Sequence, residues 1–348
     1  MSKLPFIVAG LSLTLVGAAV AGVYLWDASR DDLIARGVSA GGVEIGELRA
    51  AEARALLHER LAAPLERPLR VRTPGGGPTL RLSASRARLE TDVEGMVQEA
   101  LARSRGGNAL TRTLRDVREQ RVEADVPARI SYSKRAVERL VRAAGRAIDR
   151  PARDARLSYS ATGLSKVRSR DGVALRARRL ERAIERELVL PDSDRTVRAQ
   201  MKKVRPEVAT ADLAERYPSF ITVDRRSYQL RYFRNLEHVK TYRIAVGKVG
   251  LETPKGLYRI QNKAIDPAWS VPEAEWAGRL AGKVIPGGRK DNPLKARWMG
   301  IYDGAGIHGT DDESSLGSSA SHGCIRMAVP EVKELYRRVE VRTPVFIA

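Results

Sequence analysis

The sequence predicts a multidomain protein of the α+β class, built from three successive parts. Residues 4–26 contain no charged side chain, residues 33–205 alternate between helical and strand patterns, and residues 218–348 show mostly strand patterns. The first pattern is typical of a transmembrane helix, the second of an α+β domain and the third of a mostly-β domain. We therefore expect an anchor within residues 1–30, two domains at 33–205 and 218–348, and a basic, polar linker at 206–217.

The uncharged run from Leu4 to Trp26 is long enough to cross a hydrocarbon core of about 30 Å. Lys3 precedes the run and Asp27 follows it, so the charge balance favours a cytoplasmic N-terminus and an exported remainder. The sequence thus predicts a single-pass protein of the cell membrane. The alternative is a signal peptide cleaved at the site Ala19-Val20-Ala21, which would release a secreted protein.

The region from residue 33 to residue 205 shows the order helix, hairpin, helix twice. Apolar residues recur at helical spacing in four segments, which are 50–61, 92–104, 133–148 and 175–188. Short strand patterns flank Gly75 in the first half and Gly163 in the second. This order predicts a pseudo-repeated α+β domain that either binds a wall component or serves as a spacer.

Strand patterns dominate the C-terminal part of the chain. The expected strands are 219–224, 227–233, 239–246, 256–261 and 341–347. Residues 262–299 are rich in Pro, Gly and Trp and predict a long loop with a short helix near 273–280. A helix is expected at 330–339, because Pro330 suits a first turn and apolar residues follow at helical spacing.

The chain is strongly basic, with 62 Lys and Arg against 42 Asp and Glu and a net charge of +20. Such an excess favours a polyanionic partner. Nucleic acid is not expected, because the sequence shows no helix-turn-helix pattern and little aromatic interleaving of its basic residues. Anionic wall polymers and lipid headgroups suit an exported protein better.

Cys324 is the single cysteine of the 348 residues, so it cannot form an internal disulfide. It follows Gly323 in a small, polar segment, and His308 and His322 lie near it in sequence. A thiol beside an imidazole can be held as the thiolate, which is the nucleophile in acyl transfer. The alternatives are an inert core thiol and a zinc ligand, although structural zinc prefers four ligands and no second cysteine exists. We expect no metal and no cofactor.

Several ordered motifs make the last third of the chain resemble the L,D-transpeptidase (YkuD-type) catalytic domain of bacterial cell-wall enzymes. They are Ile244-Ala245-Val246-Gly247, Thr253-Pro254-Lys255-Gly256, residues 292–299, Gly306-Ile307-His308-Gly309-Thr310 and Ser321-His322-Gly323-Cys324-Ile325-Arg326. The resemblance covers about residues 218–348 and implies a β-sandwich-like fold. The preceding region more weakly resembles a peptidoglycan-binding domain found before transpeptidase and VanW-type domains.

The resemblance also implies the roles of particular residues. Cys324 would be the nucleophile, His308 the base, and the carbonyl of Gly309 the group that orients the base. The backbone amides of His322, Gly323 and Cys324 would form the oxyanion hole. Five side chains are expected to contact substrate, namely Ser321, Trp298, Met299, Tyr302 and Arg326.

The implied reaction is cross-linking of peptidoglycan stem peptides. Cys324 would accept the acyl group of a tetrapeptide stem, and the side-chain amine of another stem would resolve the thioester, joining third residues. Two alternatives stay open at this point. Water could resolve the thioester, as in an L,D-carboxypeptidase, or the site could be degenerate in a non-catalytic wall-binding protein.

Overall fold

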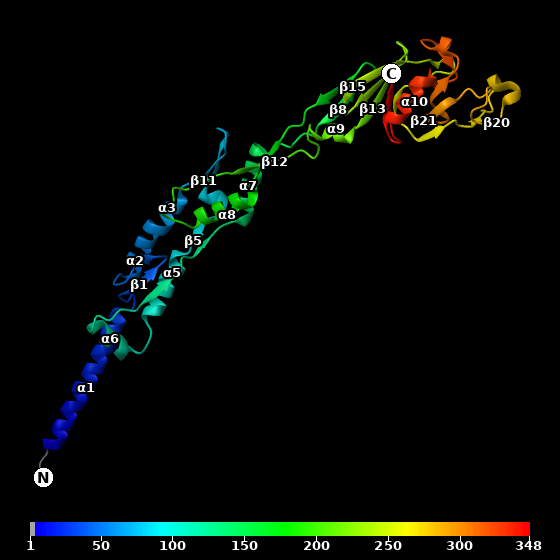
Figure 1. Cartoon of the computed structure of the whole chain (residues 1–348). Coiled ribbons are helices and arrows are strands. Elements are labelled where there is room, and N and C mark those ends of the chain that lie inside the picture. The colour runs from blue at the N-terminus through cyan, green and yellow to red at the C-terminus, as the bar shows by residue number, and fades with distance from the viewer. Residues whose placement is uncertain (1–3) are drawn as a thin grey trace. The chain divides into compact units, whose positions relative to one another are not determined.

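The computed structural model describes residues 4–348, with side chains from Gly17 onward, and its contacts divide the chain into two compact units (Figure 1). Unit 1 comprises Met1–Arg150 and Val173–Lys203, and unit 2 comprises Pro151–Gly172 and Val204–Ala348. The chain therefore contributes Pro151–Gly172 to unit 2, returns to unit 1 at Val173, and continues in unit 2 from Val204 onward.

Unit 1 is mostly helical. Its helices are α1 (Leu4–Ser29), α2 (Ala50–Leu57), a π-helical turn η1 (His58–Ala62), α3 (Ala63–Glu66), α4 (Ala84–Ala87), α5 (Val93–Ser104), α6 (Ala109–Val117), α7 (Lys134–Ile148) and α8 (Ala177–Leu188). Its strands are β1 (Val38–Ala40), β2 (Val43–Glu44), β3 (Leu69–Arg72), β4 (Thr79–Leu82), β5 (Glu90–Thr91), β6 (Ala124–Val126), β7 (Ile130–Ser131), β10 (Gly172–Leu175), β11 (Thr196–Arg198) and β12 (Met201–Val204). The four helices expected from apolar spacing are all present.

The segment predicted to span a membrane is helical, as α1. Among the side chains that the structure describes, however, no helix combines the length and the apolar character needed to cross a bilayer. The predicted transmembrane helix is therefore not supported by the structure. Residues 4–16 of the expected span lie outside the described side chains.

The predicted pseudo-repeat does not fold as two equivalent modules. The first hairpin, β3 and β4, joins β11 in a three-stranded sheet that packs within a core shared with α7 and α8. The second hairpin, β8 (Arg156–Tyr159) and β9 (Leu164–Val167), pairs only with itself and belongs to unit 2. A second core of unit 1 lies between α2, α5, β1 and β6.

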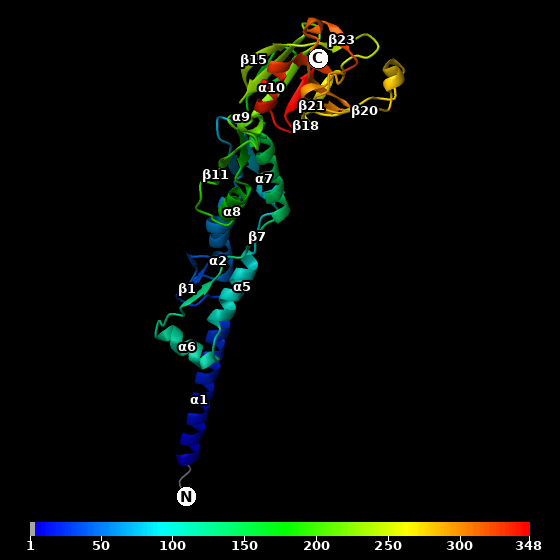
Figure 2. The same cartoon turned by 45° about the vertical axis from the view of Figure 1, so that its right-hand side comes forward.

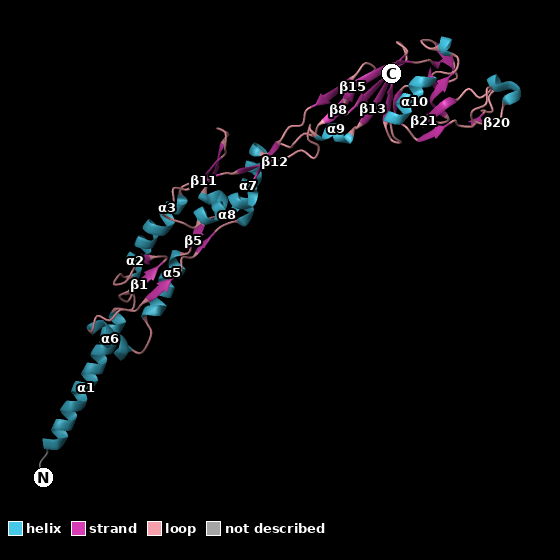
Figure 3. Ribbon diagram, viewed as in Figure 1, coloured by secondary structure: helices cyan, strands magenta, loops and turns pink. Residues whose placement is uncertain are grey.

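Unit 2 is rich in strands, as Figure 3 shows by its magenta arrows. Besides β8 and β9, its strands are β13 (Ser219–Asp224), β14 (Gln229–Arg234), β15 (Glu237–Arg243), β16 (Val246–Gly247), β17 (Gly256–Arg259), β18 (Asn262–Ile265), β19 (Trp269–Ser270), β20 (Val284–Ile285), β21 (Lys295–Tyr302), β22 (Ala305–Thr310), β23 (Ser319–Ser321), β24 (Ile325–Ala328) and β25 (Pro344–Ile347). Its helices are α9 (Asp212–Arg216), α10 (Val329–Arg338) and the 3₁₀ turns η2 (Glu275–Leu280) and η3 (Glu313–Ser315).

Two sheets of unit 2 enclose one hydrophobic core. The first has five strands in the order β15-β14-β13-β25-β17, and the second has four in the order β18-β21-β22-β24. Ile221 and Val345 of the first sheet and Met299, Ile307 and Ile325 of the second are buried in the same cluster. Helix α10 packs against β21 and β22 (Figure 2). This arrangement agrees with the β-rich, sandwich-like domain expected at the C-terminus.

The hairpin β8–β9 covers the outer face of the five-stranded sheet. Along β13, Ile221 faces the core, so its neighbours Phe220 and Thr222 face outward, yet both are buried. Tyr159 of the hairpin packs on Phe220 and Phe346 at ring-centroid distances of 5.7 and 4.8 Å. The carbonyl oxygen of Ala161 accepts hydrogen bonds from Thr222 Oγ1 (3.1 Å) and the Arg231 guanidinium (2.9 Å).

Candidate active site

The expected base, His308, lies on β22, and the expected nucleophile, Cys324, immediately precedes the adjacent parallel strand β24. β22 pairs with β24 so that Ile307 lies opposite Ile325 and His308 opposite Arg326. Because Ile307 and Ile325 are buried in the core, His308 and Arg326 face the other side of the sheet. Cys324, two residues before Arg326, falls on that same side, diagonally across from His308.

These residues line one cavity of about 650 Å³. Of the residues expected at the site, it is lined by Cys324, His308, Arg326, Ser321, His322, Gly323, Trp298 and Tyr302. Met299 and Gly309 are the exceptions: Met299 is fully buried in the core, Gly309 is also buried, and neither lines the cavity. Alternation along β21 explains the difference, since Trp298 on one face of the strand puts Met299 on the other. The expected contact of Met299 with substrate was therefore wrong.

His308 is buried and held in one orientation. Its Nδ1 donates a hydrogen bond to the carbonyl oxygen of Gly309 at 2.8 Å, so the neutral ring has an unprotonated Nε2 that can accept a proton. Burial lowers the pKa of His308 to about 4, while the hydrogen bond to Gly309 opposes this shift and Arg326 adds to it. The imidazole of His308 is therefore neutral at neutral pH, as a general base requires.

Cys324 is partly exposed, and desolvation by the surrounding protein raises the pKa of its thiol. The backbone N–H of Gly306, which donates to the sulfur, and the positive charge of Arg326 both oppose this rise in pKa. The sequence suggested a thiolate held by imidazole. The structure instead favours a neutral thiol and a neutral imidazole, because burial disfavours the charged form of each group.

We expect activity to depend on a group that titrates near pH 4 and not near 6.5. Only the neutral form of His308 can take the thiol proton, and burial disfavours its cationic form. The rate constant kcat/KM should therefore stay level as pH falls through 6.5, and then decrease as pH falls through about 4. A pH profile of kcat/KM tests this, and a midpoint at 6 to 7 would show that the pKa of His308 is not lowered.

A network of hydrogen bonds around Thr253 shapes the turn before Cys324. The buried Oγ1 of Thr253 accepts from the N–H of Gly247 (3.0 Å) and donates to the carbonyl of Gly323 (2.9 Å). Gly323 has a φ of +108°, a conformation that favours glycine. Thr253, known from the sequence only as part of a motif, thus fixes the backbone next to the nucleophile.

Ser321 changes the expected oxyanion hole. Its hydroxyl donates to the carbonyl of Cys324 at 2.6 Å and accepts from the N–H of Gly323 at 3.2 Å. The amide of Gly323 is therefore engaged within the turn, contrary to the expectation that it would bind the oxyanion. The amides of His322 and Cys324 stay as the oxyanion donors that we propose.

Replacement of Thr253 by valine should lower kcat by about 10- to 100-fold, because a turn displaced by even a fraction of an ångström misaligns the nucleophile. Valine keeps the shape of threonine but leaves the Gly247 N–H and the Gly323 carbonyl without their partner. Thr253→Ser, which keeps Oγ1, is the matched control and should retain most of the activity. Equal rates for the two variants would show that the hydroxyl does not position the turn.

Gly306, whose N–H donates to the Cys324 sulfur, also packs closely against the ring of Trp298. A Cβ added to Gly306 would lie 2.8 Å from the Trp298 ring and 2.5 Å from the carbonyl oxygen of Met299. Trp298 is fixed by a hydrogen bond from Nε1 to Asn262 Oδ1 (2.9 Å), and its ring stacks on His308 at a centroid distance of 6.2 Å. Glycine at position 306 therefore leaves room for the ring beside the base.

The segment that follows β18 contains Asn292, the first residue of the 292–299 motif, and Trp276, which sequence reasoning did not assign to the site. Buried Asn292 donates from Nδ2 to the carbonyls of Pro267, Ile285 and Pro286, and so closes the base of the loop. Trp276 of η2 stacks on the His322 ring at a centroid distance of 4.1 Å. The loop thus lies against the cavity, and the aromatic character of residues 262–299 was the signal for it.

A buried neutral imidazole beside a thiol, within reach of a guanidinium, defines a cysteine–histidine site of the kind that transfers acyl groups. Residues 218–347 match the family model of the L,D-transpeptidase catalytic domain. Residues 80–197 match a second family model, described as "Putative peptidoglycan binding domain". The two matches lie in the regions for which the sequence suggested them.

Individual relatives agree with the first match. The protein "Putative L,D-transpeptidase YqjB" of Bacillus subtilis (strain 168) is 36% identical over 134 residues, which cover 37% of this chain and 70% of the relative. "Probable L,D-transpeptidase YbiS" of Escherichia coli (strain K12) is 30% identical over 132 residues, which cover 36% of this chain and 43% of the relative. The chain belongs to the L,D-transpeptidase family.

Solved structures of the same family are also similar. The catalytic domain of the E. faecium L,D-transpeptidase, solved by NMR, is 27% identical and matches over 38% of this chain and 98% of its own, with a TM-score of 0.31. A TM-score this low adds nothing to the fold derived above.

Proposed function

We propose that this protein cross-links peptidoglycan as an L,D-transpeptidase, with Cys324 and His308 as the catalytic pair. The observation that carries the proposal is the diagonal placement of a partly exposed thiol and a buried, carbonyl-oriented imidazole on one cavity. The membership of residues 218–347 in the L,D-transpeptidase family supplies the substrate class, which is the stem peptide.

The proposed reaction has two halves. In the first, His308 Nε2 takes the proton of Cys324, the sulfur bonds to the acyl carbon, and the C–N bond breaks as His308 returns the proton to the leaving D-Ala amine. In the second, the amine of another stem attacks the thioester and loses its proton to His308. The C–S bond then breaks, and the thiolate recovers the proton from His308.

Three cavity residues are proposed to hold the donor stem. Arg326 faces the cavity and offers a planar fork of donors to a carboxylate or carbonyl. Burial raises the pKa of Tyr302 to about 12, with the charge of Cys324 as a smaller cause, so its hydroxyl stays a donor. Trp298 gives a flat apolar wall next to His308.

Mass spectrometry of muropeptides after incubation with purified tetrapeptide monomers tests the reaction. A transpeptidase produces cross-linked dimers together with free D-Ala, whereas an L,D-carboxypeptidase produces tripeptides and D-Ala without dimers. Dimers whose bond joins two third residues support the proposal. Tripeptides alone would assign the carboxypeptidase activity to the same site, and unchanged monomers would leave only a wall-binding role.

We further propose that unit 1 holds the enzyme on the wall through positive charge. The match of residues 80–197 to a peptidoglycan-binding family and the net charge of +20 support this. Electrostatic attachment weakens as the screening length falls from about 10 Å at 0.1 M salt to about 3 Å at 1 M. The full chain should therefore pellet with wall sacculi at low salt and be released at high salt. Pelleting that does not depend on the salt concentration would argue for binding through an uncharged groove.

The location proposed for the protein is outside the cytoplasm, next to the wall, with attachment through residues 4–26. This part of the proposal rests on the uncharged sequence alone. Fractionation of cells that express the full chain tests it. Recovery with membranes after a high-salt wash supports attachment, and recovery of a shortened chain from the medium would favour cleavage near Ala21.

A further inference from the structure

Helix α6 is amphipathic, but its apolar face is the one exposed to solvent. Its apolar residues Leu110, Leu114 and Val117 share one face at helical spacing, and they are 56%, 44% and 70% exposed. A helix on the surface of a domain ordinarily buries its apolar stripe and shows its charges to water. In α6 the apolar stripe is the outward face.

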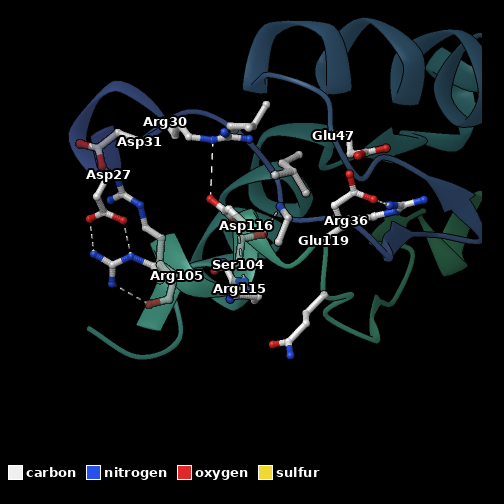
Figure 4. Close-up of a pocket in the computed structure, with 15 residues that line it drawn as sticks. Asp27, Arg30, Asp31, Arg36, Glu47, Ser104, Arg105, Arg115, Asp116 and Glu119 are labelled. Carbon is white, nitrogen blue, oxygen red and sulfur yellow. Dashed lines mark hydrogen bonds and ion pairs between the residues drawn. The ribbon is translucent and has the colours of Figure 1, made fainter. Parts of the chain in front are cut away.

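The charged face of α6 is the one packed inward. Arg112 forms a bidentate salt bridge with Asp27 of α1, in which Nε donates to Oδ1 at 2.8 Å and Nη2 donates to Oδ2 at 2.5 Å. Arg115 donates to the carbonyl of Ser104 at 2.7 Å, and Asp116 lies 3.6 Å from the guanidinium of Arg30. Figure 4 shows Asp27, Arg30, Arg115 and Asp116 among the residues that line a polar pocket. These contacts fix which side of α6 faces out.

A second set of exposed apolar side chains lies on the helix to which α6 is tied. Tyr24, Leu25 and Trp26 of α1 are 65%, 73% and 48% exposed, and they directly precede Asp27, the partner of Arg112. Figures 1 and 2 both show α6 beside this end of α1, and the two helices are in contact. One end of unit 1 therefore carries apolar and aromatic side chains on two adjacent helices.

The surroundings of α6 are basic. Residues 105–121 contain five arginines, at positions 105, 112, 115, 118 and 121, against the two acids Asp116 and Glu119. Arg118 and Arg121, which follow the helix, are both exposed. A short helix with an apolar face, aromatic neighbours and a basic flank is the combination that binds an anionic lipid interface.

We propose that α6 lies in the headgroup layer of a membrane that contains anionic lipids, with Leu110, Leu114 and Val117 turned toward the acyl chains. A glycan is a poorer occupant, because the exposed side chains of Leu110, Leu114 and Val117 carry no polar group to bond sugar hydroxyls. The proposal depends on the extracytoplasmic location proposed above but not on the catalytic function. It also differs from the attachment through residues 4–26, since α6 contacts the bilayer surface only.

Site-specific fluorescence on the full chain tests this. In a Cys324→Ala background, Leu114→Cys carries an environment-sensitive label on the outward face of α6, and Gln98→Cys carries the same label on an exposed site of α5. Each protein is added to vesicles of phosphatidylcholine with or without phosphatidylglycerol, and brominated acyl chains serve as the quencher. Circular dichroism and the melting temperature establish that each labelled protein is folded.

The label at position 114 should shift to shorter wavelength and be quenched by brominated chains in anionic vesicles, while the label at position 98 should do neither. Identical behaviour of the two labels overturns the proposal, whether or not the protein binds the vesicles. An equal response to vesicles of phosphatidylcholine alone would show that anionic lipid is not required, and would overturn that part of the proposal. A shift that grows with protein concentration without lipid would assign the face to a second copy of the chain, and would also overturn it.

Discussion

Replacement of Cys324 by alanine should abolish cross-link formation and leave the fold intact. The chain contains no other thiol, and the side chain lines a cavity instead of filling the core. Loss of a nucleophile that acts together with its base costs on the order of 10⁴-fold or more in kcat. The muropeptide assay measures this loss, and an unchanged melting temperature shows that it is not caused by unfolding.

Cys324→Ser is the matched control for shape. Serine has a shape close to that of cysteine, but its hydroxyl is far less acidic than a thiol, and His308 is oriented by a carbonyl and not by a carboxylate. The serine variant should therefore also be inactive. Cross-linking by either variant at the wild-type rate would falsify the assignment of Cys324 as nucleophile.

Replacement of His308 by glutamine should reduce kcat by about 10²- to 10⁴-fold, the range expected for loss of a general base. Glutamine can occupy the space beside Trp298, but it cannot accept the thiol proton. The cross-linking rate at pH 7 measures the effect. Because desolvation raises the pKa of the Cys324 thiol, the variant should regain some activity at alkaline pH, where the thiol ionises without help.

His322→Ala is the control for the second histidine of the site. Its ring stacks on Trp276, and burial together with Lys248 and Arg326 lowers its pKa, but its proposed contribution to the reaction comes from its backbone amide. The alanine variant should therefore lose much less activity than His308→Gln. If His322→Ala lost more activity than His308→Gln, the roles that we assign to the two histidines would have to be exchanged.

The chemistry that we propose for the site could be formulated from the sequence, because it depends on residue types close together in the chain. Cys324, His308 and the Gly309 carbonyl needed only the motif and the resemblance. Met299 was assigned wrongly because the face on which a residue lies depends on strand register, and a shift of one residue exchanges the two faces. The engagement of the Gly323 amide by Ser321 depends on backbone angles, which residue types alone do not specify.

The elements of the fold were predictable where the periodicity was long, as in α5, α7 and α8. Helix α6 was missed because Leu110, Leu114 and Val117 span only eight positions, and several arginines and threonines interrupt them. The hairpin β8–β9 was assigned to the N-terminal region because its neighbours in sequence belong there. Its contacts with Phe220 and Phe346 join residues far apart in the chain, and such contacts leave no local pattern.

The place of β25 in its sheet has a consequence for how the enzyme is made. Strand β25 lies between β13 and β17, so the five-stranded sheet stays split in two as long as only the residues before Pro344 have been synthesised. A stop codon at position 344 removes a central strand, and not an exposed terminal segment of the kind whose deletion is usually tolerated. Such a truncated chain should therefore fail to mature.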